Sequence, residues 1–267
     1  MTTLTVPAYA GEQHVSQFRV IRSEWTKLRS LASTLWCLLA MVALVVGVGL
    51  SYATLRAARP PADPAGFDAT AVSLAGVQLA QFALGVLGVL FVTGEYATGS
   101  IRVSLAAVPG RLPLLWGKAV TFGAAALLLA VPAVLVAFFA GQQVLAGQHL
   151  DVGIGAPGVL RAVLGSALFL TAVGLLGLAL GALLRNTAAG VSALFGLLFA
   201  PQLVLGLAPE PVSDAVYRYL PTPAGAAVSY VGHDPLMLGP WTGLGLFCLY
   251  TAALLGLAAW LLRRRDV

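Results

Sequence analysis

The sequence predicts an all-α, polytopic membrane protein with six transmembrane helices, an amphipathic N-terminal helix and one short helix in a loop. Three observations carry this prediction. Of the 267 residues, 59% are hydrophobic and only 9% are charged, with a mean hydropathy of +0.92, whereas about a quarter of the residues in soluble domains are charged. Six separate stretches are apolar over the length that crosses a bilayer, and the charges fall between them. We therefore expect a single transmembrane domain, 1–267.

Each of the six apolar stretches contains roughly the 20 residues that a helix needs to cross a hydrocarbon core. Their content of glycine, alanine and leucine favours helices over the alternating pattern of a membrane β-barrel. The first stretch begins too late and is too long for a secretory signal, so we expect it to be retained as a span. The predicted spans are 35–55, 71–93, 119–140, 162–184, 188–208 and 241–262.

The segment 12–32 precedes the first span and is predicted to form an amphipathic helix on the membrane surface. Its basic residues Arg22, Lys27 and Arg29 can face water or anionic headgroups. Such a helix acts as a membrane anchor alone or also contacts a cytoplasmic partner, and the sequence leaves both open. Four apolar residues of the segment are spaced three or four apart on one helical face: Phe18, Ile21, Trp25 and Leu28.

Lysine and arginine are concentrated on one side of the predicted topology. The N-terminal segment, the loop 94–118, the turn at Arg185 and the C-terminal tail hold 11 of the 15 basic residues. By the positive-inside rule, both termini and the 94–118 loop are cytoplasmic, in a multi-pass protein of the cytoplasmic membrane. This asymmetry accounts for the net charge of +5, so no nucleic-acid partner is expected.

The connections on the outer side differ in length and content. Residues 56–68 are rich in proline, which predicts a short turn region without a fold of its own. Residues 209–240 are longer and include Tyr217, Tyr219 and Tyr230 among small residues, as an element at the membrane interface would. This longer connection is either an interfacial anchor or a re-entrant lid over an exit path.

The predicted spans lack the residues that intramembrane chemistry needs. A charge held in hydrocarbon is costly and marks proton relays and active sites, yet no ionisable side chain lies deep in a predicted span. There is no HExxH or GxSxG motif, the three histidines lie outside the spans, and Cys37 and Cys248 are interpreted as small apolar residues. No catalytic, cofactor-binding or metal-binding residue is predicted, and the chain is not expected to be an enzyme.

Polar residues within the predicted spans are uncharged. Gln78 and Gln81 lie one turn apart in the second span, Thr171 lies in the fourth and Gln202 in the fifth. Side chains of this kind form interhelical hydrogen bonds, or they line a substrate path, and both interpretations stay open. A GxxxG pattern that begins at Gly177 predicts close packing against another helix.

The loop 94–118 ends in GRLPLLWGKAV, which must be tested as a phosphate-binding loop. Such a loop requires G-x-x-x-x-G-K-[ST], so that backbone amides surround the phosphates and a hydroxyl reaches Mg²⁺. Here six residues separate Gly110 from Gly117, Pro113 lacks an amide hydrogen, and Ala119 replaces the hydroxyl. We therefore expect this chain to bind no cofactor, and any ATP and magnesium to be bound by a separate polypeptide.

An apolar ridge is predicted in the middle of the same loop. Ile101, Leu105 and Val108 are spaced four and three apart, and Pro109 and Gly110 follow them. This spacing predicts a short helix that ends at the proline. A ridge on a basic loop is suited to a groove on a partner protein.

The order of these features resembles the permease subunits of ABC type 2 exporters, over nearly the whole chain. The N-terminal helix ends in IRSEWTKLRS, and LGALLRNTAAGVSALFGLLF at 180–199 is similar to the family's turn between the fourth and fifth spans. The first cytoplasmic loop places Glu95, Gly99 and the 101–108 helix before Pro109, Arg111 and the Gly-Lys pair at 117–118. One departure is that Tyr96 and Ala97 follow the glutamate, where many members are more charged.

The resemblance implies that 94–118 contains a coupling helix that sits in a cleft of a separate ABC ATPase subunit. It implies a permease homodimer or heterodimer working with two ATPase subunits, which bind ATP and magnesium. The exporter would move an amphiphilic or hydrophobic substrate, such as a drug, an antibiotic or a lipid, across the cytoplasmic membrane. The residues implied in ATPase coupling are Glu95, Gly99, Ile101, Arg102, Leu105, Val108, Pro109 and Arg111.

The alternative is a non-transporting, six-helix membrane subunit with a structural or regulatory role. A channel is disfavoured because the sequence contains neither rings of pore-lining charge nor a filter-like loop. Transport and a regulatory role differ in one respect that can be measured, which is whether an ATPase is recovered with the chain.

Overall fold

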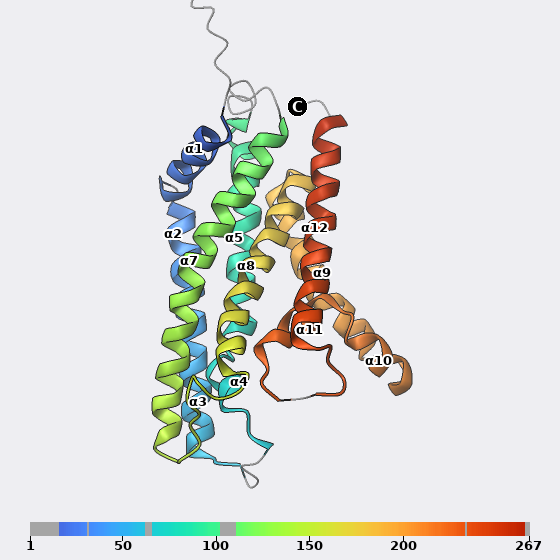
Figure 1. Ribbon diagram of the computed structural model, residues 1–267. Coiled ribbons are helices and arrows are strands. Elements are labelled where there is room, and N and C mark those ends of the chain that lie inside the picture. Colours follow the sequence, from blue (N-terminus) through green and yellow to red (C-terminus); the bar gives the residue numbers. More distant parts are fainter. Residues whose placement is uncertain (1–15, 31, 62–65, 102–110, 233, 265–267) are drawn as a thin grey trace, which may run out of the picture.

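The computed structural model describes residues 16–30, 32–61, 66–101, 111–232 and 234–264, and within them every regular element is helical (Figure 1). A π-helical turn, η1, joins α2 to α3, and a short 3₁₀ turn, η3, follows α11. The elements are α1 (Gln17–Ser30), α2 (Ala32–Ala43), η1 (Leu44–Val48), α3 (Gly49–Ala58), α4 (Ala69–Ser73), α5 (Val77–Ala97), α7 (Arg111–Ala146), α8 (Val159–Leu184), α9 (Thr187–Leu205), α10 (Glu210–Tyr217), α11 (Pro221–Ala226), η3 (Ala227–Ser229) and α12 (Pro240–Arg264).

The prediction of six spans is confirmed, because six helices are long and apolar enough to cross a membrane. The chain is therefore a multi-pass membrane protein. The first of the six is continuous through α2, η1 and α3, and the other five are single helices. Their bounds are Ala32–Ala58, Val77–Ala97, Leu112–Ala146, Val159–Leu184, Thr187–Leu205 and Pro240–Arg264.

Helices α5 and α8 form the centre of the bundle, and they have the largest buried fractions of the six. Their close contact depends on glycine: a Cβ atom added to Gly177 of α8 would overlap the carbonyl oxygen of Gly85 on α5. The close packing predicted from the GxxxG pattern is therefore present within the chain itself. Phe82 of α5 also stacks on Phe195 of α9, with ring centroids 4.8 Å apart.

The two ends of the bundle are named here by their contents. The proximal end carries α1, the end of α5, the start of α7 and the C-terminal end of α12 (Figure 1). The distal end carries α3, α4 and α10. Both described ends of the chain are thus at the proximal end, as an even number of spans requires.

The helices that flank the predicted coupling loop extend further into the 94–118 segment than the sequence predicted. Helix α5 continues to Ala97 and α7 begins at Arg111, so residues 94–97 and 111–118 are helical extensions of the spans. Helix α7 has 36 residues, which at ~1.5 Å per residue is about 54 Å. Because a hydrocarbon core is about 30 Å thick, α7 extends beyond the core.

The distal connection between α9 and α12 turns back into the bundle. Helix α10 has no buried residue, whereas α11 and η3 are mostly buried and pack against α8 and α12. The guanidinium of Arg161 on α8 donates hydrogen bonds to the carbonyl oxygens of Val228 and Tyr230. Residues 221–229 are therefore held inside the bundle. The interpretation of the 209–240 connection as a re-entrant lid stays a prediction.

Candidate functional site

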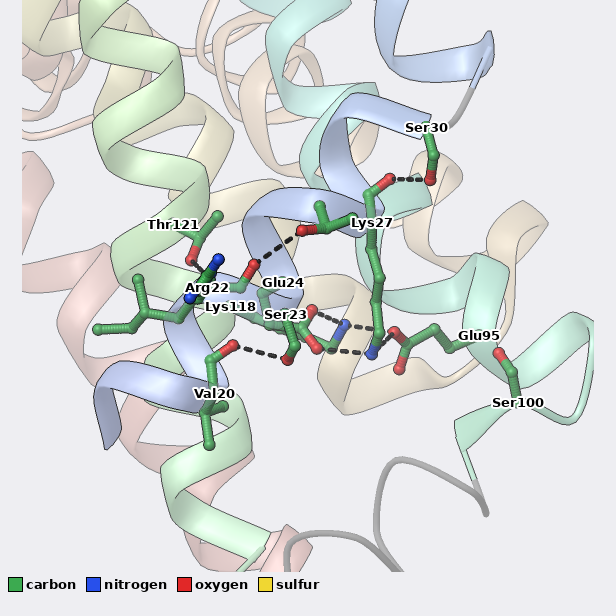
Figure 2. A network of polar contacts seen from close by, with 12 residues as sticks. Val20, Arg22, Ser23, Glu24, Lys27, Ser30, Glu95, Ser100, Lys118 and Thr121 are labelled. Carbon is green, nitrogen blue, oxygen red and sulfur yellow. Dashed lines mark hydrogen bonds and ion pairs between the residues drawn. The ribbon is translucent and has the colours of Figure 1, made fainter. Parts of the chain in front are cut away.

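Four charged side chains meet at the proximal end, where α1, α5 and α7 converge (Figure 2). The Lys118 ammonium on α7 lies 2.6 Å from a carboxylate oxygen of Glu24 on α1 and 2.8 Å from one of Glu95 on α5. Lys27 of α1 makes the same two contacts, at 2.6 Å to Glu24 and 2.8 Å to Glu95. Each carboxylate thus bridges both lysines, and we call these four residues the ion network.

The ion network is largely removed from solvent. The exposed fractions of the side chains are 0% for Glu24, 3% for Lys118, 12% for Glu95 and 37% for Lys27. An unpaired charge at such positions would cost several kcal/mol. Among the described residues, two acids and two bases meet here, and the centroid of the Phe91 ring lies 4.7 Å from the Lys118 ammonium. The charges of these four residues therefore balance although they are largely buried.

The spacing of residues on α1 explains how Glu24 reaches this position. Val20, Glu24 and Leu28 follow one another at intervals of four, and they are the buried residues of the helix. The buried face of α1 shares Leu28 with the apolar face predicted from the sequence, but it is rotated from that face, because Phe18 is exposed and Trp25 is only half-buried. A carboxylate between two buried apolar residues must find its partners within the protein, and it finds them on α7 and α1.

Further contacts hold α1 closely against α7. A Cβ atom added to Gly117 would approach Val20 to 2.7 Å, which is closer than real contacts allow. The Gln17 amide donates a hydrogen bond of 2.9 Å to the carbonyl oxygen of Pro113, and the Thr121 hydroxyl donates one of 3.3 Å to that of Ile21. The glycine of the Gly-Lys pair thus permits the approach that brings Lys118 to Glu24.

The ion network also sets the protonation of Lys27. Partial burial alone would lower its pKa, but the hydrogen bonds and charges of Glu24 and Glu95 outweigh burial and raise the pKa above its ordinary value. Lys27 is consequently charged throughout the neutral pH range.

The predicted coupling residues have different places in the structure. Glu95 belongs to the ion network, and its second oxygen has no hydrogen-bond partner in the described part of the chain. Gly99 follows α5 with a φ of 71°, in the left-handed region that favours glycine. Ile101 is 6% exposed and packs in a small cluster with Val20 and Leu114, so in this structure its side chain faces the chain itself.

The other predicted coupling residues cannot be placed in the same way. Arg102, Leu105, Val108 and Pro109 lie outside the described residues, and so does the apolar ridge that they were predicted to form. Arg111 is the first residue of α7, and only its backbone is described.

Three members of the ion network were not selected from the sequence as site residues: Glu24, Lys27 and Lys118. A usable signal was present, because Glu24 is the only acid in α1 and it takes the middle place in an apolar series with a spacing of four. Lys118 was assigned to a loop, since it stands at the boundary of the apolar stretch. Its burial arises from α1, which covers this part of α7.

Of the polar residues proposed to line a substrate path, the structure joins only two. The Gln81 amide donates a 2.7 Å hydrogen bond to the carbonyl oxygen of Gln78, and Gln78 lines a distal pocket of about 620 Å³. The Thr171 hydroxyl donates to Ala167 of its own helix. Gln202 lies on α9, near its distal end.

The comparisons with known proteins leave the family open. No protein-family model matches the chain, and no curated protein matches it either. Within the described residues, no three histidine, cysteine, aspartate or glutamate side chains gather as a metal site requires. A functional proposal for this chain therefore depends on its topology, its motifs and the ion network.

Proposed function

We propose that this chain is the transmembrane permease subunit of an ATP-binding cassette exporter, driven by a separate ATPase subunit. The observation that carries the proposal is the ion network, which ties α1 to the two helices on either side of the predicted coupling helix. Glu95 lies two residues before the end of α5, and Lys118 is the eighth residue of α7. A force applied to the loop between them would reach both helices and α1 together.

A force on the loop reaches the bundle only if α5 and α7, the helices on either side of the loop, do not bend independently of each other. Three short ion pairs link α1, α5 and α7, a fourth lies within α1, and the apolar cluster of Val20, Ile101 and Leu114 lies beside them. Helix α5 is in turn packed along α8 at the centre of the bundle. In this proposal, closure of the ATPase displaces the loop, and the ion network converts that displacement into a joint movement of three helices.

In the same proposal, the partner subunit and not this chain binds and hydrolyses ATP. The failed phosphate-loop spacing around Gly117 supports nucleotide binding on a separate polypeptide. The basic residues at the proximal end support a cytoplasmic placement of that end, where an ATPase would meet it. The substrate class is an amphiphilic or hydrophobic compound, and two such permease subunits would assemble with two ATPase subunits.

The test is the recovery of an ABC ATPase with the chain. The tagged chain is purified in mild detergent from its native membranes, and co-purified proteins are tested for ATP hydrolysis and for a Walker A sequence. Leu105→Asp is the informative variant because Ile101 already packs against Val20 and Leu114, so an aspartate at 101 would also disturb the fold. Leu236→Asp, in an exposed distal turn, introduces the same charge far from the loop.

We expect the wild type and Leu236→Asp to recover equal ATPase activity, and Leu105→Asp to recover almost none while it inserts normally into the membrane. An aspartate in an apolar contact surface costs several kcal/mol of binding, enough to lose the complex during purification. If the wild type recovers no such ATPase, or Leu105→Asp recovers as much as the wild type, the proposal fails. The first of these results would favour the non-transporting subunit.

A further inference from the structure

A pocket of about 390 Å³ lies between α1, α2 and α7. Each helix contributes residues at helical spacing, and most of the wall is apolar. Trp25 and Arg29 come from α1, Thr34 and Leu38 from α2, and Leu128 and Leu129 from α7. The ion network uses other side chains of α1, so the pocket is a separate feature.

The pocket has one buried polar group without a partner. Thr34 is 4% exposed, and its hydroxyl has no hydrogen-bond partner in the described part of the chain. An unsatisfied buried hydroxyl costs about 1–3 kcal/mol. Because threonine has two accessible χ1 rotamers in helices, a rotation can turn this hydroxyl toward the pocket, where a ligand could satisfy it.

A cationic group stands at the same pocket. Arg29 is exposed, and it makes no ion pair with an acid in the ranges that the structure describes. Among the described residues that line the pocket, none is an aspartate or a glutamate. Arginine binds phosphate oxygens through two parallel hydrogen bonds. A headgroup that also carries an ammonium group would have no carboxylate to pair with among these residues, so the pocket favours an anionic headgroup.

The position of the pocket fits a ligand that is polar at one end and apolar along its length. Thr34 lies in the first turn of the first span, and Leu35, Leu128 and Leu129 are exposed on membrane-spanning helices. The pocket therefore lies where the headgroup region of the bilayer meets the hydrocarbon. Basic pockets between transmembrane helices at this level are suited to anionic lipid headgroups.

We propose that this pocket binds one anionic phospholipid of the leaflet at the proximal end. Arg29 binds the phosphate, the Thr34 hydroxyl donates to an ester carbonyl of the glycerol backbone, and one acyl chain lies along Leu38, Leu128 and Leu129. The bound lipid fixes α1 against α2 and α7. The site does not depend on the proposed transport function, because it requires only the described contacts of these three helices.

The test measures lipid binding to the purified chain by native mass spectrometry. Dioleoyl phosphatidylglycerol, dioleoyl phosphatidylcholine and inorganic phosphate are added separately to the protein in detergent. We expect one phosphatidylglycerol per chain, bound at least about tenfold more tightly than phosphatidylcholine, since only the former avoids an unpaired ammonium. Inorganic phosphate should not compete, because it lacks the acyl chains.

Two pairs of variants locate the site. Arg29→Gln should weaken phosphatidylglycerol binding about tenfold, whereas Arg19→Gln, an exposed arginine of the same helix outside the pocket, should change it no more than about twofold. Leu128→Trp should fill the pocket and abolish binding. Leu257→Trp, at an exposed leucine of α12, should leave it unchanged.

Three results would overturn the proposal. Equal affinity for the two lipids would remove the selectivity on which it rests. Equal losses in Arg29→Gln and Arg19→Gln would indicate a general basic surface. Competition by inorganic phosphate at the concentration where phosphatidylglycerol binds would indicate an anion site without a lipid. All four variants replace exposed side chains, and size-exclusion chromatography checks that each remains folded.

Discussion

Helix α7 is fastened near both of its ends by buried polar side chains, but the two attachments differ in kind. At the proximal end, Lys118 is held by the carboxylates of Glu24 and Glu95. At the distal end, Gln142 is held by neutral groups alone. The two residues lie about 36 Å apart along the helix, at ~1.5 Å of rise per residue, so both attachments lie near the edges of a hydrocarbon core of about 30 Å.

The distal attachment consists of three hydrogen bonds to one amide. Gln142, which is 7% exposed, donates to the carbonyl oxygen of Ala69 at 3.1 Å and to the hydroxyl of Ser73 at 3.0 Å. Its own oxygen accepts a hydrogen bond of 2.7 Å from the backbone amide of Val152. These contacts join α7 to α4 and to the chain that follows α7.

The comparison teaches what each attachment can do. In the ion network every charge balances two others, so the loss of one member leaves uncompensated charge in a buried place. In the amide network each hydrogen bond contributes about 1 kcal/mol and can be lost singly. Under the proposed coupling, charges therefore suit a junction whose three helices move together, whereas neutral amides suit a fixed attachment.

The largest effect is expected from Lys118→Met, which removes the central cation of the ion network. Among the described residues, Lys27 would then be the one cation that Glu24 and Glu95 share, and one negative charge of the network would stay buried without compensation. We expect a loss of about 3–5 kcal/mol in the free energy of unfolding, measured by titration with SDS in mixed micelles.

The matched control for Lys118→Met is the double variant Glu24→Gln with Lys118→Met, which removes one charge of each sign. It should recover a substantial part of the lost stability, because Lys27 and Glu95 remain as a balanced pair. A double variant that is no more stable than Lys118→Met would contradict the account of charge balance and would point to packing alone.

A smaller effect is expected from Gln142→Leu at the distal end. The substitution removes three hydrogen bonds and leaves the Val152 amide unpaired, whereas the Ala69 carbonyl oxygen keeps the hydrogen bond that it accepts from the Ser73 hydroxyl. Unfolding should therefore require about 1–3 kcal/mol less free energy. Combined with Lys118→Met, the two losses should add to within about 0.5 kcal/mol, because the sites are far apart and share no partner. A clearly non-additive pair would show that the two ends of α7 are coupled.

The smallest effect concerns pH. Since the folded state raises the pKa of Lys27, its contribution to stability is fully present at neutral pH and is lost as the pH rises through the raised pKa, above about pH 10.5. The melting temperature should therefore fall in this alkaline range, less steeply in Lys27→Met than in the wild type. Gln142→Leu should retain the alkaline fall of the wild type, and an identical fall in Lys27→Met would argue against the assignment.

The spans were predictable because membrane insertion selects composition directly. A stretch of about 20 apolar residues has few alternatives to a helix across the bilayer, and each of the six predicted stretches overlaps one helical span. Their ends were less predictable. The helix of α7 begins at Arg111, well before the apolar stretch that starts at Ala119, because a helix can continue through polar residues when a neighbour such as α1 covers it.

The candidate site was predictable only in part. Glu95 stood out in the sequence through its place in a recognisable loop motif, whereas Lys118 was taken as the end of a Gly-Lys pair. Glu24 was not selected from the sequence as a site residue. Only the approach of α1 to α7, which Gly117 permits, brings these two residues into direct contact with each other.

The sequence by itself determined the all-helical, six-span architecture and the excess of basic residues at the proximal end. These depend on composition and on hydrophobic length, which act on each segment separately. The tertiary structure decided which charges are buried together, which face of α1 meets the protein, and where a pocket with an unpaired Thr34 hydroxyl forms. Those features depend on contacts between residues far apart in the chain, and the pattern of a single segment contains no information about its neighbours in space.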